Sequence, residues 1–184
     1  MTIKNMEKLI DYITKVEIFS ATAYKATDKE KKYTMYLVNG YVISEEEAKV
    51  LLVQDLQAHI PTGILTEVYN AGNTLMDYQI DVLVSLRFSN GSITTTGSPL
   101  FTAYLKSGNY NEKETLNKIL SYTTQGQTVL PGLVKRRIAE AMIFSGYGYP
   151  EINGDNFYSD KELINELYNY ASNLGEERAK YCVE

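Results

Sequence analysis

The sequence is informative first for what it lacks. Its 184 residues include one cysteine, Cys182, so no internal disulfide is possible and a reducing compartment is expected. A single histidine, His59, excludes by count any site that needs two or more histidines. No apolar run approaches the roughly 20 residues of a membrane span. The charged N-terminal segment has no small-residue cleavage site. We therefore expect a cytoplasmic protein that makes no membrane contact.

Signatures of known reactions are also missing. Neither Gly-x4-Gly-Lys-Ser/Thr nor Gly-x-Gly-x-x-Gly occurs, so no nucleotide site is indicated. Asp55 and His59 lie four residues apart, which is typical of a salt link in the last turn of a helix. Asp77 and Asp81 are too far apart on an extended strand to share one ion. We expect no catalytic residue, no cofactor and no metal, and hence a protein that is not an enzyme.

The overall composition is that of an ordinary globular protein. Hydrophobic residues make up 44% and charged residues 22%, and the net charge is −5. The length fits a single domain over residues 1–184. An acidic balance argues against a general nucleic-acid binder. The charges nevertheless alternate in blocks: residues 1–32 and 106–137 are net positive, and 33–105 and 138–184 are net negative. Such blocks can present faces of opposite sign.

Several segments carry the signals of short helices. Apolar residues recur at helical spacing over 3–14. Ser44 with Glu47 forms the pattern of a capping box, and Asn111 with Glu114 forms a similar pair. Pro131 is a suitable first residue of a helix. We expect helices that begin near these signals and a last helix that begins with the pair Ser159 and Glu162.

Strand signals are strongest over residues 76–88. Apolar side chains occupy every second position there, which predicts a long, half-buried antiparallel strand. Weaker β character marks the segments 16–25, 33–39, 64–69, 93–96 and 100–106. The predicted fold is α+β: an antiparallel sheet of five or six strands with four or five short helices packed mainly on one face. Two hairpin-and-helix units, 16–57 and 76–122, would precede a helical C-terminal part, 131–184.

Candidate binding residues fall into three groups. The only basic triplet is Lys135, Arg136 and Arg137, near the start of a predicted helix, where it can meet an anion or phosphate. Tyrosine is unusually frequent, with 16 residues, and is enriched at binding surfaces. The loop tyrosines without a core stripe to join are Tyr147, Tyr149 and Tyr158. The acidic pair of the last predicted helix, which could meet a basic partner, is Glu162 and Glu166.

Three classes of function remain open on this sequence. The first is a non-enzymatic protein that binds a protein or ribonucleoprotein partner. Phage or mobile-element inhibitors of bacterial defence, such as those that block nucleic-acid-targeting nucleases, have this general style. The second is a nucleic-acid-binding regulator led by the basic triplet, whose affinity would fall steeply with salt. The third is a ligand-binding protein or enzyme whose site is assembled from scattered residues. A long strand at a sheet edge also favours a homodimer. We expect the first class.

Overall fold

Helices dominate the structure. The computed structural model describes residues 6–17, 44–91, 99–125, 128–129, 131–153 and 156–158. Its helices are α1 (Glu7–Glu17), α2 (Glu45–Ala58), α3 (Thr62–Asn70), α4 (Asp77–Asn90), α5 (Pro99–Ser107), α6 (Glu112–Leu120) and α7 (Pro131–Phe144). The strands pair antiparallel as β1 (Thr124–Gln125) with β2 (Thr128–Val129), and β3 (Glu151–Asn153) with β4 (Asn156–Tyr158). The predicted α+β fold with a five- or six-stranded sheet is therefore wrong.

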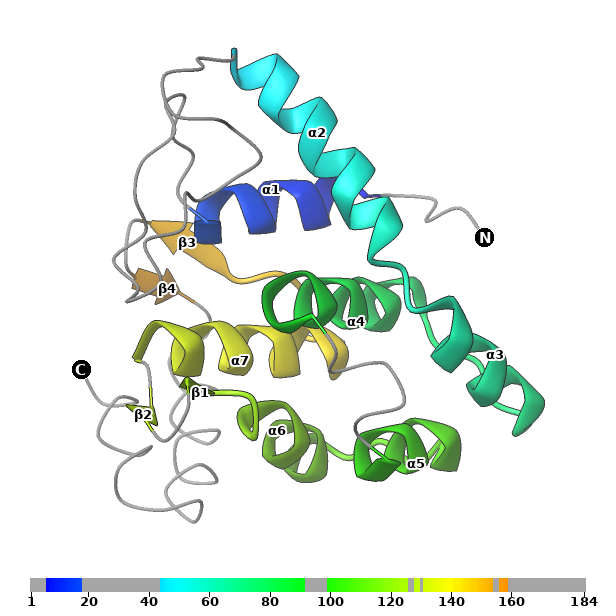
Figure 1. Ribbon diagram of the computed structural model, residues 1–184. Helices are drawn as coiled ribbons and strands as arrows, with labels where there is room; N and C mark the ends of the chain where they lie inside the picture. The colour runs from blue at the N-terminus through cyan, green and yellow to red at the C-terminus, as the bar shows by residue number, and fades with distance from the viewer. Residues whose placement is uncertain are drawn as a thin grey trace.

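Helix α4 lies at the centre of the arrangement (Figure 1). Helices α1 and α2 contact it from one side, and α7 packs along it from the other. Helix α6 packs on α7, and α5 contacts α3. Every residue of α4 from Gln79 to Leu86 is buried. The molecule thus has a core helix enclosed by its neighbours.

This enclosure explains why the predicted strand over 76–88 is a helix. Alternation of apolar and polar residues indicates a strand only if the polar residues face water. Here they do not, because three of them find partners inside the protein. The Gln79 amide donates to the Phe144 carbonyl at 3.3 Å, and the Ser85 hydroxyl donates to Glu140 at 2.6 Å. Asp81 accepts a hydrogen bond from Tyr149 at 2.6 Å. A helix buried on all sides carries no amphipathic period to detect.

Two shorter segments predicted as strands are also helical. Residues 64–69 lie in α3, and residues 100–106 lie in α5. In α5 the buried side chains of Phe101, Tyr104 and Leu105 follow the three- and four-residue spacing of a helix face. Pro99 is the first residue of this helix, a position where its missing N–H costs nothing. The aromatic and threonine content of residues 100–106 favours a strand, but tertiary packing overrides this preference.

The helix-start signals are confirmed at three places. The Ser44 hydroxyl accepts from the Glu47 N–H at 3.2 Å, while the Glu47 carboxylate accepts from the Ser44 N–H at 2.9 Å. Asn111 caps α6 by accepting from the Glu114 N–H at 2.8 Å. Helix α7 begins at Pro131. Capping is local chemistry, so short sequence patterns predict it well.

Other predictions concern residues that the structure describes in part or not at all. Strands 33–39 and 93–96, most of 16–25 and the helix beginning at Ser159 lie outside the described residues, except that residues 16–17 belong to α1. The second predicted hairpin-and-helix unit, 76–122, is instead built from α4, α5 and α6. No helix among the described residues is long and apolar enough to cross a membrane.

Candidate active site

Two arginines and one glutamate of α7 form a buried ionic cluster. Arg136 and Arg137 precede Glu140 by four and three residues, so the helix brings all three side chains together. The Arg136 Nε lies 3.2 Å from Glu140 Oε1, and an Arg137 guanidinium N–H donates to the other carboxylate oxygen. Their side chains are at most 6% exposed. Burial lowers the pKa of Arg137, and the charge of Glu140 opposes that shift.

Helix α4 completes this cluster with two serines spaced one turn apart. The Ser85 hydroxyl donates to Glu140 Oε1 at 2.6 Å and lies 3.3 Å from an Arg136 nitrogen, which donates to it. The Ser89 hydroxyl accepts from Arg137 at 2.7 Å. We call Ser85, Ser89, Arg136, Arg137 and Glu140 the ionic cluster. It fixes the register of α7 against α4, because a shift of either helix would leave buried charges without partners.

Helix α1 meets α7 beside the ionic cluster. The Tyr12 hydroxyl donates to the carbonyl oxygen of Arg136 at 3.4 Å. Leu9 and Ile13 of α1 are fully buried and lie four residues apart, on the face of the helix that packs on the core. The next position in this row is Glu17, the last residue of α1. A carboxylate residue thus continues an apolar row at the end of a helix anchored to α7.

The sequence reading missed Glu17. The predicted strand over residues 16–25 separates Glu17 from the helix that contains it. The available signal was the four-residue interval from Leu9 to Ile13 to Glu17, an acidic residue in the core-facing row of an amphipathic helix. The other two acidic residues of α1, Glu7 and Asp11, are exposed.

A second buried carboxylate lies on α4. The Tyr149 hydroxyl donates to Asp81 Oδ2 at 2.6 Å, and the Tyr149 ring packs edge-to-face on Tyr12 with centroids 5.9 Å apart. Asp81 Oδ1 has no hydrogen-bond partner among the described residues. Burial raises the pKa of Asp81 to about 6, while the Tyr149 hydrogen bond opposes the shift and the charge of Asp77 adds to it. Burial and the contact with Asp81 also raise the pKa of Tyr149.

The Asp81 carboxyl makes stability depend on pH. The folded protein holds the Asp81 proton more tightly than the unfolded chain does. The stabilisation that this proton contributes to the folded state is therefore complete below pH 3.8 and is lost as pH rises through about 6. We expect the unfolding free energy of the wild type, relative to Asp81→Asn, to fall by about 3 kcal/mol between pH 3.5 and pH 7. Urea unfolding at several pH values measures this difference. The exposed Asp11→Asn serves as the control, and an Asp81→Asn profile parallel to the wild type would contradict the assignment.

The basic triplet does not form an exposed charge patch. Arg136 and Arg137 are 5% and 0% exposed, and Lys135 is half-buried. The interpretation of the triplet as a surface that meets an anion is therefore wrong for its two arginines. The physical reason is Glu140, which balances part of their charge inside the protein. The helical spacing between the two arginines and Glu140 can be seen in the sequence, but the burial of these side chains cannot.

The other predicted site residues have different outcomes. Tyr147 is 47% exposed, whereas Tyr149 is half-buried against Asp81 and Tyr12. Tyr158 belongs to β4. Asp55 and His59 are paired at the end of α2, where His59 Nδ1 lies 3.3 Å from Asp55 Oδ1 and 2.7 Å from the Asp55 carbonyl oxygen. Glu162 and Glu166 lie outside the described residues. Partner binding through the three tyrosines and through Glu162 and Glu166 stays a prediction.

The described part of the chain brings no set of carboxylates together as a metal site. Asp77 and Asp81, predicted on a strand, are one turn apart on α4. No group of three or more His, Cys, Asp or Glu side chains with the arrangement of a metal site occurs among the described residues. The polar chemistry on view is instead that of carboxylates, guanidinium groups and hydroxyls.

Comparison with solved structures defines the class of fold as lysozyme-like. The endolysin from Escherichia coli O157:H7 phage FAHEc1 matches with a TM-score of 0.63 at 20% identity, over 82% of this chain and 98% of that one. The muramidase domain of SpmX from Asticaccaulis excentricus matches with a TM-score of 0.56 at 22% identity, over 75% and 95%. At these identities the likeness shows the fold alone.

The family follows from the sequence. The model of the phage lysozyme family matches residues 14–140, which is more than half of the chain. The chain therefore belongs to the phage lysozyme family. The endolysin of Bacillus phage B103 is 34% identical over 148 residues, which cover 73% of this chain and 51% of that protein. This chain thus spans about half the length of that relative.

These comparisons overturn the predicted function. The expectation of a non-enzymatic inhibitor of bacterial defence is wrong, because the family is one of enzymes. The expectation that the protein is not an enzyme is wrong for the same reason. A glycosidase site leaves no fixed motif in a sequence, because glycoside hydrolysis needs only a few carboxyl groups that the fold brings together.

Proposed function

We propose that this protein is a muramidase, which hydrolyses glycosidic bonds in the glycan strands of bacterial peptidoglycan. The observation that carries the proposal is the match of the phage lysozyme family over residues 14–140. The similarity to the endolysin of Bacillus phage B103, and the fold shared with a muramidase domain, support it. Its substrate lies in the cell wall. The cytoplasmic location and the protein partner expected from the sequence stay predictions.

Glycoside hydrolysis sets a specific requirement for the site. Most glycosidases use a pair of carboxyl groups, one of which is a general acid that protonates the leaving oxygen. The acid must hold its proton near neutral pH, which burial in an apolar environment favours. The protein therefore needs an acidic residue that borders both the apolar core and the surface that receives the glycan.

We assign the general acid to Glu17. It follows the buried residues Leu9 and Ile13 at four-residue spacing along α1, and it ends the helix. It lies within the matched residues 14–140. The buried carboxylates Glu140 and Asp81 have structural partners: Glu140 is held by two arginines, and Asp81 by Tyr149. Glu17 is the acidic residue of α1 whose position best meets the requirement.

The ionic cluster then acts as the frame on which the acid is placed. It locks α7 to α4, and Tyr12 ties α1 to the backbone of α7 at Arg136. A general acid must be held to within a fraction of an ångström of its working position. Building it on a helix anchored by buried hydrogen bonds supplies that rigidity.

Release of reducing ends from purified peptidoglycan sacculi tests the proposal. Each hydrolysed glycosidic bond creates one reducing sugar, whereas cleavage of the peptide stems creates an amino group. We expect the purified protein to clear a suspension of sacculi and to release reducing ends in proportion. Clearing with new amino groups and no reducing ends would contradict the proposal, as would the absence of any cleavage.

A further inference from the structure

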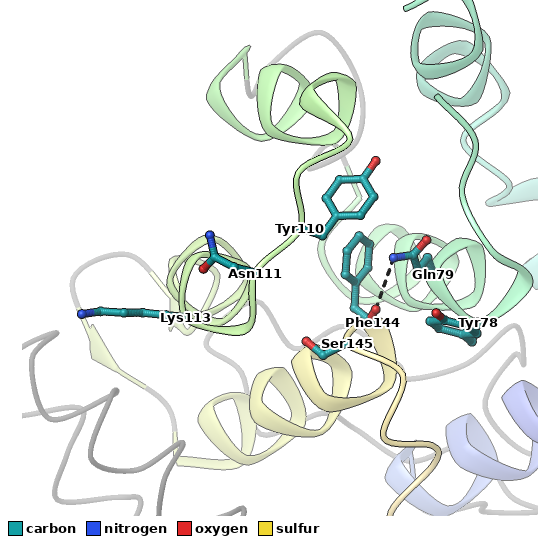
Figure 2. A pocket seen from close by; sticks show the side chains of 7 residues that line it. All are labelled: Tyr78, Gln79, Tyr110, Asn111, Lys113, Phe144 and Ser145. Carbon is teal, nitrogen blue, oxygen red and sulfur yellow. Dashed lines mark hydrogen bonds between the residues drawn. The ribbon is translucent and has the colours of Figure 1, made fainter. Parts of the chain in front are cut away.

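A pocket lies at the C-terminal end of α7, about one helical turn beyond Glu140 of the ionic cluster. Its volume is about 540 Å³, within the range of pockets that hold small organic ligands. Figure 2 shows the residues that line it, which come from the start of α4, the segment that leads into α6 and the end of α7. Arg136 and Phe144 are eight residues apart, which along a helix is about 12 Å. The pocket is therefore a second place on the molecule, apart from the end of α1.

The apolar walls of this pocket are held rigidly. The rings of Tyr110 and Phe144 pack edge-to-face with centroids 5.3 Å apart, and the Tyr110 hydroxyl donates to the Leu105 carbonyl at 2.5 Å. The Gln79 amide donates to the Phe144 carbonyl and accepts from the Met76 N–H at 2.9 Å. Phe144 is 2% exposed, so its ring supports Tyr110 from behind, and the rings of Tyr78 and Tyr110 are the aromatic surfaces that a ligand can reach. A supported ring reduces the entropy that is lost on binding.

The pocket contains two neutral hydroxyl groups that are open to a ligand, those of Tyr78 and Ser145. Neither the Tyr78 hydroxyl nor the Ser145 hydroxyl has a hydrogen-bond partner among the described residues. Tyr78 is 36% exposed, so its ring also presents an apolar surface to solvent. Lys113 lies at the rim on α6. Aromatic faces beside hydroxyl and amide groups suit a ligand that is itself apolar on its ring faces and polar at its edges.

A phosphate is a poor fit to this pocket. The starts of α4 and α6 both border it, but a side chain already occupies each: Gln79 accepts from the Met76 N–H just before α4, and Asn111 accepts from the Glu114 N–H in the first turn of α6. Acidic residues in the first turns, Asp77 and Glu114, also lower the positive potential there. A pyranose ring with hydroxyl and N-acetyl groups meets the aromatic walls and the open hydroxyls without needing an anion site.

We propose that this pocket binds N-acetylhexosamine units of a glycan strand as an accessory subsite, separate from the catalytic acid. The inference rests on the proposed function for its choice of glycan. A polymeric substrate is long enough to occupy two places on one enzyme, and a second contact raises the local concentration of the strand at the first. The pocket would thus retain the enzyme on its substrate between cleavage events.

Titration of ¹⁵N-labelled Glu17→Gln protein with N,N′,N″-triacetylchitotriose tests this subsite. The variant prevents cleavage of the probe, and amide chemical shifts report binding residue by residue. We expect shifts at Asn111, Lys113 and Ser145 that follow one binding curve. Replacing Tyr78 by alanine in the same background removes a pocket wall and is expected to weaken that curve about tenfold.

The matched control is Tyr69→Ala, which removes a tyrosine of α3 that is 71% exposed and does not line the pocket. It should leave the binding curve unchanged. Shifts confined to other parts of the protein would overturn the subsite, and so would the absence of shifts or an unchanged curve in Tyr78→Ala. Reducing-end release by the wild type is measured separately. Its failure would refute the muramidase activity, whereas failure of the titration would refute the subsite alone.

Discussion

Replacing Glu17 by glutamine is expected to lower the rate of glycan cleavage by about 100-fold or more, in the range that a general acid contributes. Glutamine has nearly the same size and cannot donate the proton to the leaving oxygen. The measurement is the initial rate of reducing-end release from sacculi at pH 6 to 7. Thermal unfolding followed by circular dichroism checks that the variant remains folded.

The matched control for this variant lies on the same helix. Glu7 opens α1 and is exposed, so Glu7→Gln makes the same chemical change ten residues earlier in the chain. We expect it to keep wild-type activity. If Glu17→Gln retained a rate within about threefold of the wild type, the assignment of the general acid would be wrong. A loss of equal size in both variants would show that α1 tolerates no such change and that the effect is not specific.

Replacing Glu140 by glutamine is expected to lower the unfolding free energy by about 3 to 5 kcal/mol, because it leaves two buried arginines without their counter-charge. Arg137 is fully buried and Arg136 nearly so. By the usual scaling for a chain of this size, the midpoint of thermal unfolding should fall by about 10 °C. Urea unfolding and calorimetry both measure the change.

An exposed ion pair provides the comparison for this prediction. Lys106 and Glu67 lie 3.5 Å apart with side chains 43% and 49% exposed, and Glu67→Gln is expected to cost at most about 1 kcal/mol. Comparing the loss of unfolding free energy in Glu140→Gln with that in Glu67→Gln isolates the effect of burial. A loss below about 1 kcal/mol for Glu140→Gln would mean that the ionic cluster does not fix α7 to α4.

Local signals were the part of the fold that the sequence predicted well. The caps at Ser44 and Asn111 and the helix start at Pro131 depend on contacts within four residues, and the structure confirms all three. Short-range chemistry of this kind is decided before tertiary packing acts.

The sequence pattern predicts a strand where the central helix α4 lies, because the environment of that helix is set by the whole fold. In α4 the polar residues Gln79, Asp81 and Ser85 are buried, and their partners are 55 to 68 residues away in sequence. A pattern rule that sends polar side chains to solvent fails wherever such distant partners exist. The predicted sheet rests mainly on a strand over residues 76–88. Because that segment is helical, the predicted fold class is wrong as well.

The site was unpredictable for a related reason. The basic triplet has the sequence pattern of a binding patch. Its two arginines instead form the buried ionic cluster with Glu140, Ser85 and Ser89. No sequence signal marks Glu17, because a single acidic residue at the end of a helix is common in any protein. Its position acquires meaning only when α1 is seen anchored to α7 through Tyr12. Sites built from isolated carboxyl groups are recognised by geometry and not by motif.

The most direct test of the central claim is mass spectrometry of the products that the wild-type protein releases from purified sacculi in H₂¹⁸O. Hydrolysis of a glycosidic bond places one oxygen atom from water on one of the two sugars that it joined. We predict ¹⁸O at the sugar ends of the released fragments, with the peptide stems intact. Fragments with intact glycan strands and ¹⁸O in newly formed carboxyl groups of the stems would contradict the claim.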